Sequence, residues 1–245
     1  MIRNATTLRF ALAALALVAW AGSSLAQVTA EPLGTFAGYS VYDHATHTSQ
    51  FEPVAPAVNA ATVVYDNSSS TPLFGFTSTD LLAVWGDELF TTGLGTLSEM
   101  KLTVFNSGSS AGPLLTAVVG VNFYDGGTST FLGGFTANFN FGTGLAAGFY
   151  TVGSITGIDP LLIDLNTTDL IVTQTIVSKT GTASRMGVVS LDPPSVGSSG
   201  ADMYISATTI GPAGWYTSAS GNANPGYQVS VTSAPVPTSK STWGR

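Results

Sequence analysis

Aromatic side chains in loop-like stretches are the residues of this sequence that could most directly bind a ligand. Trp215 and Tyr216 are adjacent in a segment rich in Gly and Ser, and Trp85 comes directly before a glycine. A flat aromatic face can stack on a sugar ring while amide and carboxylate groups bind its hydroxyls. Because tryptophan more often packs in a core or a corner, both roles are open for Trp85, Trp215 and Tyr216.

Carboxylates in turn-like segments are the second group that could bind something. Asp66 and Asp125 come directly before turn-forming residues, and Asp87 and Glu88 are adjacent. Oxygen ligands from acidic side chains and backbone carbonyls suit calcium, and the loops of β-proteins supply them. We therefore consider a structural calcium at Asp66, Asp87, Glu88 or Asp125, with turns stabilised by Asp side chains as the alternative. No other cofactor is predicted.

The only two histidines of the chain, His44 and His47, are three positions apart. On a strand these positions face opposite sides, so the two rings could share one metal ion only if the segment is a turn. Asp43 could then supply a third ligand. A solvated loop without a metal is the alternative interpretation.

Carboxylate-based hydrolysis is the one catalytic chemistry that the composition leaves open, because it needs only two acidic side chains at a suitable separation. Asp87 with Glu88, Asp125 and Asp202 are the candidates. With 14 acidic residues in the chain, a suitable pair arises easily by chance. Cysteine catalysis is excluded because the chain has no cysteine. We predict that the protein is not an enzyme.

A double-proline corner is the most distinctive local pattern of the sequence. Proline fixes its own φ and keeps the residue before it extended, so a strand ending at Asp192 must stop before Pro193 and Pro194. Gly197 then lets the chain turn freely. We predict a structural role for Asp192, Pro193, Pro194 and Gly197.

Alternation of apolar and polar residues dominates the chain, which is typical of strands. Residues 115–123 and 131–141 alternate cleanly and are joined by a Gly-containing loop, so they predict a β-hairpin. The remaining segments expected to be strands are 35–42, 61–65, 99–104, 149–155, 161–165, 169–177, 185–191, 202–207 and 227–232. At most one helical turn is expected, near 160–162. Many short strands with Gly-rich turns predict an all-β fold, an antiparallel two-sheet sandwich or jelly roll.

The first 26 residues are typical of an export signal. Arg3 and Arg9 precede an apolar run, and Ala26 ends a stretch of small residues that fits a cleavage site. We expect a single sandwich domain at 27–233 and a disordered Pro- and Ser-rich tail at 234–245. No span of a membrane is predicted in the mature chain.

The charge of the mature chain is acidic. Without Arg3 and Arg9, five basic residues stand against 14 acidic ones, which gives a net charge of −9. Nucleic-acid binding needs clustered Lys and Arg, and anionic lipid attracts the same residues, so neither partner is predicted.

Several segments together resemble a group of exported bacterial proteins of the PEP-CTERM type. The segments, in chain order, are Val64-Tyr65-Asp66-Asn67, Trp85-Gly86-Asp87-Glu88-Leu89, Val121-Asn122-Phe123-Tyr124-Asp125, the corner at 191–199, and Trp215. The similarity covers about 64–232. It implies a sandwich-like extracellular domain, usually without an assigned activity, that is displayed on or released from the cell envelope.

The C-terminal end departs from that family's pattern. Family members typically end in Val-Pro-Glu-Pro, an apolar helix and an arginine cluster. Here Pro235-Val236-Pro237 is followed by no Glu, no apolar helix and no arginine cluster. The triplet Ser241-Thr242-Trp243 does look similar to the family's C-terminal end. We therefore predict an exported, non-enzymatic protein of the cell surface or extracellular matrix. The alternative is a carbohydrate-binding module for extracellular polysaccharide, and a glycoside hydrolase is the more distant one.

Overall fold

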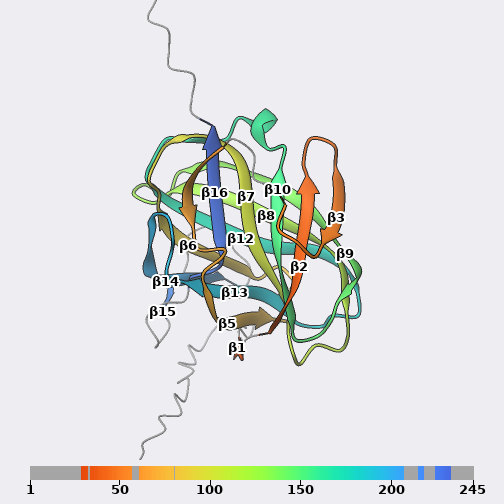
Figure 1. Cartoon of the computed structure of the whole chain (residues 1–245). Helices are drawn as coiled ribbons and strands as arrows, with labels where there is room; N and C mark the ends of the chain where they lie inside the picture. Colours follow the sequence, from red (N-terminus) through yellow and green to blue (C-terminus); the bar gives the residue numbers. More distant parts are fainter. Residues whose placement is uncertain are drawn as a thin grey trace, which may run out of the picture.

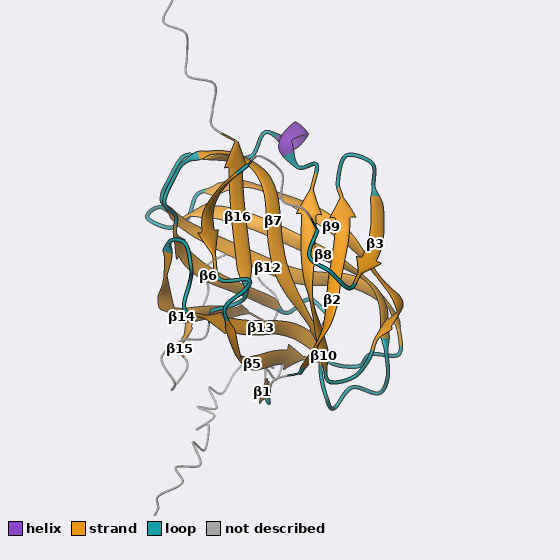
Figure 2. Ribbon diagram, viewed as in Figure 1, coloured by secondary structure: helices purple, strands orange, loops and turns teal. Residues whose placement is uncertain are grey.

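The structure is a computed structural model that describes residues 29–32, 34–56, 61–79, 81–206, 215–217 and 224–232. The predicted export signal and C-terminal tail lie outside these residues. Strands carry almost all of the regular structure, and the single 3-10 turn η1 (Asp159–Leu161) is the only helical element in the described part (Figure 2). No helix among the described residues is long and apolar enough to cross a membrane.

The described strands form two sheets, which confirms the predicted all-β sandwich. The larger sheet, sheet A, has ten strands, whose main path is β1 (Thr29–Glu31), β5 (Thr71–Ser78), β13 (Met186–Asp192), β7 (Gly95–Asn106), β10 (Phe149–Thr156), β2 (Thr35–Asp43) and β3 (Thr48–Glu52). Off this path, β16 (Tyr227–Thr232) pairs with β7 and with β4 (Thr62–Asp66), and β11 (Asp164–Leu165) pairs with β7. Sheet B has six strands in the order β15 (Trp215–Thr217), β14 (Ser198–Ser206), β6 (Val84–Phe90), β12 (Asp169–Gly181), β8 (Leu114–Asp125) and β9 (Phe131–Leu145).

The two sheets pack face to face with their strands crossing. Figure 1 shows β16, β7, β10 and β2 of sheet A upright in front, and β12, β8 and β9 of sheet B running across behind them. Pairing between neighbouring strands is antiparallel except for β2 and β10, which run parallel. The parallel pair places the N-terminal hairpin of β2 and β3 beside a strand that lies far along the chain.

The core lies between the sheets and follows the alternation seen in the sequence. Phe123 of β8, Leu102 of β7 and Trp85 of β6 are each 1% exposed or less. In the hairpin of β8 and β9, Val121 pairs with Phe135 and both side chains are buried. This hairpin is where the sequence predicted it, because apolar residues at every second position must share the buried face.

Most of the other predicted strands are also present, at β2, β4, β7, β10, β12, β13, β14 and β16. The strand predicted at 161–165 is wrong: this segment holds the end of η1 and only the two-residue β11. The helical turn expected near 160–162 is confirmed as η1. Five strands were not predicted: the three-residue β1 and β15, the latter in a stretch expected to be a loop, and β3, β5 and β6, whose sequences lack a clean alternation.

Candidate functional site

Three of the carboxylates singled out in the sequence gather around Tyr65 at the end of β4. The Asp66 amide donates to Val196 O at 3.0 Å, and the Ser195 amide donates to Asp66 O at 2.7 Å, so the proline corner is bonded to this strand. The peptide bond between Asp192 and Pro193 is cis. We call this region, residues 65–67, 87, 192–199 and 224–227, the interior corner.

Asn67 holds the interior corner together. Its side chain is fully buried and donates from Nδ2 to Leu191 O (2.8 Å) and Pro225 O (3.1 Å). Its Oδ1 accepts the Tyr227 amide at 2.6 Å. One side chain therefore satisfies backbone groups of β13, of β16 and of the segment before β16, groups that would otherwise be buried without partners.

Gly197 closes the corner against the core. Its φ is +75°, which L side chains rarely adopt. A Cβ at this position would lie 2.6 Å from Phe90 O and 3.1 Å from Tyr65 Cδ2. The predicted structural role of Gly197 thus has two physical reasons, backbone conformation and close packing.

The tyrosines of the interior corner are strongly perturbed. Burial, followed by the carboxylates of Asp87, Asp192 and Asp66, raises the pKa of Tyr65 far above its ordinary value, and the nearby Ser199 side chain opposes this rise. Burial and then Asp87 likewise raise the pKa of Tyr227. Both phenols are therefore held in the neutral form, since ionisation would place a second negative charge beside a buried carboxylate.

Two of the sequence predictions are corrected in this region. Trp85 was a candidate for stacking on a ligand, but its ring is 1% exposed and packs in the core. Asp87 and Glu88 were expected in a turn, whereas they lie in the middle of β6. Successive strand residues face opposite sides, so this pair can neither flank one glycosidic bond nor bind one calcium ion together.

The remaining predicted aromatic residues, Trp215 and Tyr216, form part of β15 at the edge of sheet B. Their backbones pair with Tyr204 and Met203 of β14. Their side chains lie outside the described residues, as does the side chain of Asp202. The prediction that Trp215 and Tyr216 bind a ligand therefore stays a prediction.

The other calcium candidates, Asp66 and Asp125, take part in turns. Asp66 Oδ1 accepts from the amide and hydroxyl of Ser68, each at 2.8 Å. Asp125 Oδ1 accepts from the Thr128 amide at 2.7 Å and its hydroxyl at 2.9 Å. Within the described ranges, no three acidic or histidine side chains come together as a metal site would require. The calcium ion stays a prediction.

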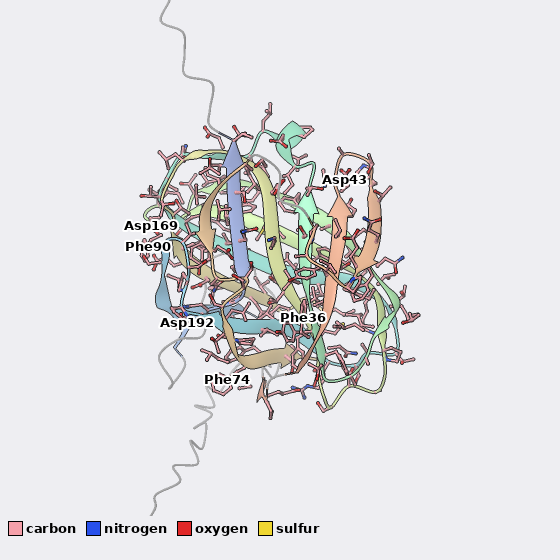
Figure 3. All side chains as sticks on the ribbon, viewed as in Figure 1. Phe36, Asp43, Phe74, Phe90, Asp169 and Asp192 are labelled. Atoms are coloured by element: carbon pink, nitrogen blue, oxygen red, sulfur yellow. The ribbon has the colours of Figure 1, made fainter. Side chains whose placement is uncertain are left out.

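One carboxylate near Asp125 was not singled out in the sequence. Asp169 begins β12, and its backbone oxygen accepts the Gly126 amide at 2.7 Å. Its Oδ1 is buried without a hydrogen-bond partner among the described residues. Figure 3 shows Asp169 next to Phe90, with which it pairs in register. No sequence signal could have found it, because the pairing of β6, β12 and β8 creates the neighbourhood.

The two histidines do lie in a turn, between β2 and β3. Their ring centroids are 5.5 Å apart, and the Tyr42 hydroxyl lies 3.0 Å from His47 Nδ1. Asp43 Oδ1 accepts the amides of Ala45 and Thr46, so the carboxylate stabilises the turn. The turn that a shared metal would need is present, but a third ligand from the described side chains is not.

A Gly-x-Ser-x-Gly pattern at Gly108–Gly112 was overlooked in the sequence, with Ser110 at its centre. In serine hydrolases this pattern forms a strained turn between a strand and a helix. Here it follows β7 in a turn without a helix, and Ser110 Oγ accepts the Ser184 amide at 2.7 Å. Gly108 and Ser109 of this pattern line a hollow that neither histidine of the described residues lines.

An aromatic row on the outer face of sheet A is the most exposed candidate site. Phe36 of β2 pairs with Tyr150 of β10, which pairs with Phe105 of β7. The Phe36 ring lies 5.3 Å from the Tyr150 ring and 5.2 Å from the Tyr39 ring, and Phe36 is 40% exposed. We call Phe36, Tyr39, Tyr150 and Phe105 the aromatic row; Figure 3 labels Phe36 low on β2.

An open hollow of about 540 Å³ adjoins the buried end of the aromatic row at Phe105. Glu31 and Arg185 line it, with 3.7 Å between Arg185 Nε and Glu31 Oε1. Glu31 also accepts hydrogen bonds from the hydroxyls of Ser107 (2.6 Å) and Thr77 (2.8 Å). The hollow therefore combines the aromatic Phe105 with a fixed pair of opposite charges and the hydroxyl of Ser109.

The aromatic row was missed in the sequence because its members are far apart along the chain. Residues 35–42 were predicted as an edge strand, which is wrong, because β2 lies between β10 and β3. The density of aromatic residues there was the only available sequence signal. Comparisons with family models, curated proteins and solved structures found no match to this chain. The candidate site must therefore be interpreted from its own geometry.

Proposed function

We propose that this chain is an exported, non-enzymatic β-sandwich protein of the cell surface or extracellular matrix that binds polysaccharide through the aromatic row. The observation that carries the proposal is the exposed Phe36 ring, in contact with Tyr39 and Tyr150, beside the hollow of Glu31 and Arg185. Such a surface has apolar ring faces and polar groups within reach of one another.

The chemistry of a sugar fits both parts of this surface. A pyranose has an apolar face of C–H groups that packs on an aromatic ring, and equatorial hydroxyls that need donors and acceptors at its edge. Phe36 and Tyr39 supply the accessible ring faces, while Tyr150 and Phe105 are buried beside them.

The carboxylates support a binding role more than a catalytic one. Asp87 is buried in the interior corner, and Asp66 and Asp125 stabilise turns. Glu31, the carboxylate in the hollow, accepts several hydrogen bonds that fix β1 to its neighbours. These roles are structural, and a hydrolase would need two carboxylates facing one bond.

The test is a glycan array followed by co-sedimentation of the mature chain with insoluble polysaccharides. We expect the wild-type protein to bind, and the variant Phe36→Ala/Tyr39→Ala to lose at least about tenfold in affinity, which corresponds to about 1.4 kcal/mol. Phe36 is exposed, so its own truncation should change the free energy of unfolding by no more than about 1 kcal/mol.

Phe90→Ala is the matched control. Phe90 is also 40% exposed, but it lies on β6 of sheet B. The control variant should bind polysaccharide like the wild type. Equal loss of binding in Phe90→Ala and in Phe36→Ala/Tyr39→Ala, or unchanged binding in the latter, would contradict a site at the aromatic row.

A further inference from the structure

We propose a second saccharide-binding site, a groove at the outer face of sheet B, so that one molecule binds two polymer chains. The assignment of a saccharide rests on the proposed function; the groove itself does not. It has a volume of about 490 Å³ and shares no lining residue with the hollow on sheet A. Its lining includes Gly120, Asn122, Gly134, Thr136, Leu161 and Val177.

Two glycines shape the floor of this groove. A Cβ at Gly134 would lie 2.5 Å from Asn122 Oδ1, so the glycine leaves the space in which the Asn122 amide lies across β9. Gly120 of β8 sits between Thr175 and Val177, and a Cβ there would be 3.4 Å from a methyl group of each. Any larger side chain at Gly120 would fill the groove.

The groove offers hydrogen-bonding groups that the fold does not use. The Asn122 amide and the Thr136 hydroxyl have no hydrogen-bond partner in the described part of the chain, whereas the Thr175 hydroxyl donates to Ala83 O at 2.9 Å. An amide supplies two donors and an acceptor, and a hydroxyl supplies both kinds of group. These are the groups that bind the hydroxyls of a sugar.

The walls of the groove are apolar. Val177 of β12 is 44% exposed and Leu161 of η1 is 38% exposed. Leu161 comes from the loop that lies beside the start of β9, where Ile163 contacts Gly133. Exposed apolar walls around unused polar groups are the usual make-up of a small-ligand site.

The charge of the groove indicates the class of ligand. No acidic or basic side chain lines it apart from the imidazole of His44, although the whole chain carries a net charge of −7. A nucleic acid, an anionic lipid or a charged peptide would find no complementary charge there. An uncharged chain of hydroxyl-bearing sugars needs none.

Two sites on opposite sheets have a consequence that one site lacks. A molecule that binds one polymer chain at the aromatic row and another at the groove joins the two chains into a network. Binding to one long polymer would also gain affinity from the second contact, because the effective local concentration is high. We infer that the protein cross-links neutral polysaccharide.

The experiment uses the mature chain with soluble dextran, laminarin, mannan and hydroxyethyl cellulose as probes, in affinity electrophoresis and in a turbidity assay. Wild-type protein should bind at least one of these polymers and make its solution turbid. Phe36→Ala/Tyr39→Ala should retain weaker binding without turbidity. Adding Asn122→Ala to that variant should lower the remaining affinity at least about tenfold.

Thr136→Val is the second variant, since its side chain is exposed and the change should not disturb folding. Alone it should abolish turbidity while binding persists. Asn138→Ala is the matched control: Asn138 is exposed on the same strand and does not line the groove. This control should bind and cross-link like the wild type.

The outcomes separate the two proposals. If Phe36→Ala/Tyr39→Ala binds nothing while wild type and Asn122→Ala bind equally, the groove is wrong and the aromatic row stands. If only Asn122→Ala and Thr136→Val lose binding, the groove stands and the aromatic row is wrong. If the wild type binds none of the four polymers, the groove proposal is overturned with the proposed function.

Discussion

The interior corner and the aromatic row both contain tyrosine side chains and use them in opposite ways. In the corner, Asp87, Tyr65 and Tyr227 are fully buried, and Asp87 is close enough to both phenols to raise their pKa. In the row, Phe36 and Tyr39 lie on the outer face of sheet A. Both regions contain aromatic rings that could stack on a ligand. The difference teaches that burial, and not residue type, decides which of them can meet a ligand.

Removing the side chain of Asn67, which holds the interior corner together, should have the largest effect on the free energy of unfolding. Asn67→Ala leaves three buried backbone groups without partners, each worth about 1–3 kcal/mol. We expect a loss of about 3–5 kcal/mol in the free energy of unfolding, measured by urea denaturation. The exposed Asn138→Ala should change it by no more than about 0.5 kcal/mol. A small loss for Asn67→Ala would show that the corner does not hold the fold together.

Adding a methyl group at Gly197 should have the next largest effect on the free energy of unfolding. Gly197→Ala forces an L residue into a left-handed conformation, which costs about 1–2 kcal/mol, and places its Cβ against Phe90 O. We expect the free energy of unfolding to fall by about 2 kcal/mol or more. Gly127→Ala, in the exposed hairpin turn where a Cβ has room, should stay within about 0.5 kcal/mol. Equal effects of the two changes would contradict close packing at the corner.

Alkaline pH should weaken the interior corner most, although burial and then Tyr39 also raise the pKa of Tyr150 in the aromatic row. The pKa of Tyr65 and of Tyr227 is raised in the folded state, so their contribution to stability is complete below pH 10 and declines as pH rises above it. One pH unit higher, each tyrosine should have lost about 1 kcal/mol.

The measurement compares urea midpoints of wild type and Tyr65→Phe at pH 8 and at about pH 11. The variant should lose less stability than the wild type between the two values, because it has one fewer phenol to ionise. A wild-type protein whose midpoint is the same at both values would argue against two buried neutral tyrosines.

The smallest effect on stability is expected for Asp125, a carboxylate outside both the interior corner and the aromatic row. Asp125→Asn keeps the Oδ1 acceptor of the turn, so the free energy of unfolding should change by no more than about 0.5 kcal/mol. Calcium at about 1 mM, the weak end of extracellular sites, should leave the melting temperature of wild type unchanged. A rise with calcium that Asp125→Asn abolishes would instead establish the ion.

The fold was predictable where each strand has one face in the core and one in solvent. The hairpin of β8 and β9 is the clearest case, since its apolar residues recur at every second position. The unpredicted β6 places Asp87 on its core face, so its sequence has the appearance of a turn. In β5 the last four residues are all buried, which removes the alternation altogether.

The candidate site was less predictable, because pairing between distant strands creates it. Phe36, Tyr150 and Phe105 become neighbours only through the pairing of β2, β10 and β7. Asn122 and Gly134 meet through the register of β8 and β9. The sequence predicted the interior corner better, since proline, glycine and aspartate restrict the backbone locally. It could not show that Trp85 is buried in the core.

The parallel pairing of β2 with β10 also sets an order of assembly. As the chain leaves the ribosome, β2 and β3 emerge early, directly after β1, yet the strand that β2 must join, Phe149–Thr156, emerges after more than half of the chain. Until then the hairpin that carries Phe36 and His44 has no sheet to join. Contacts between such distant segments slow folding. A nascent or truncated chain that stops before β10 should therefore leave this hairpin undocked and both proposed sites incomplete.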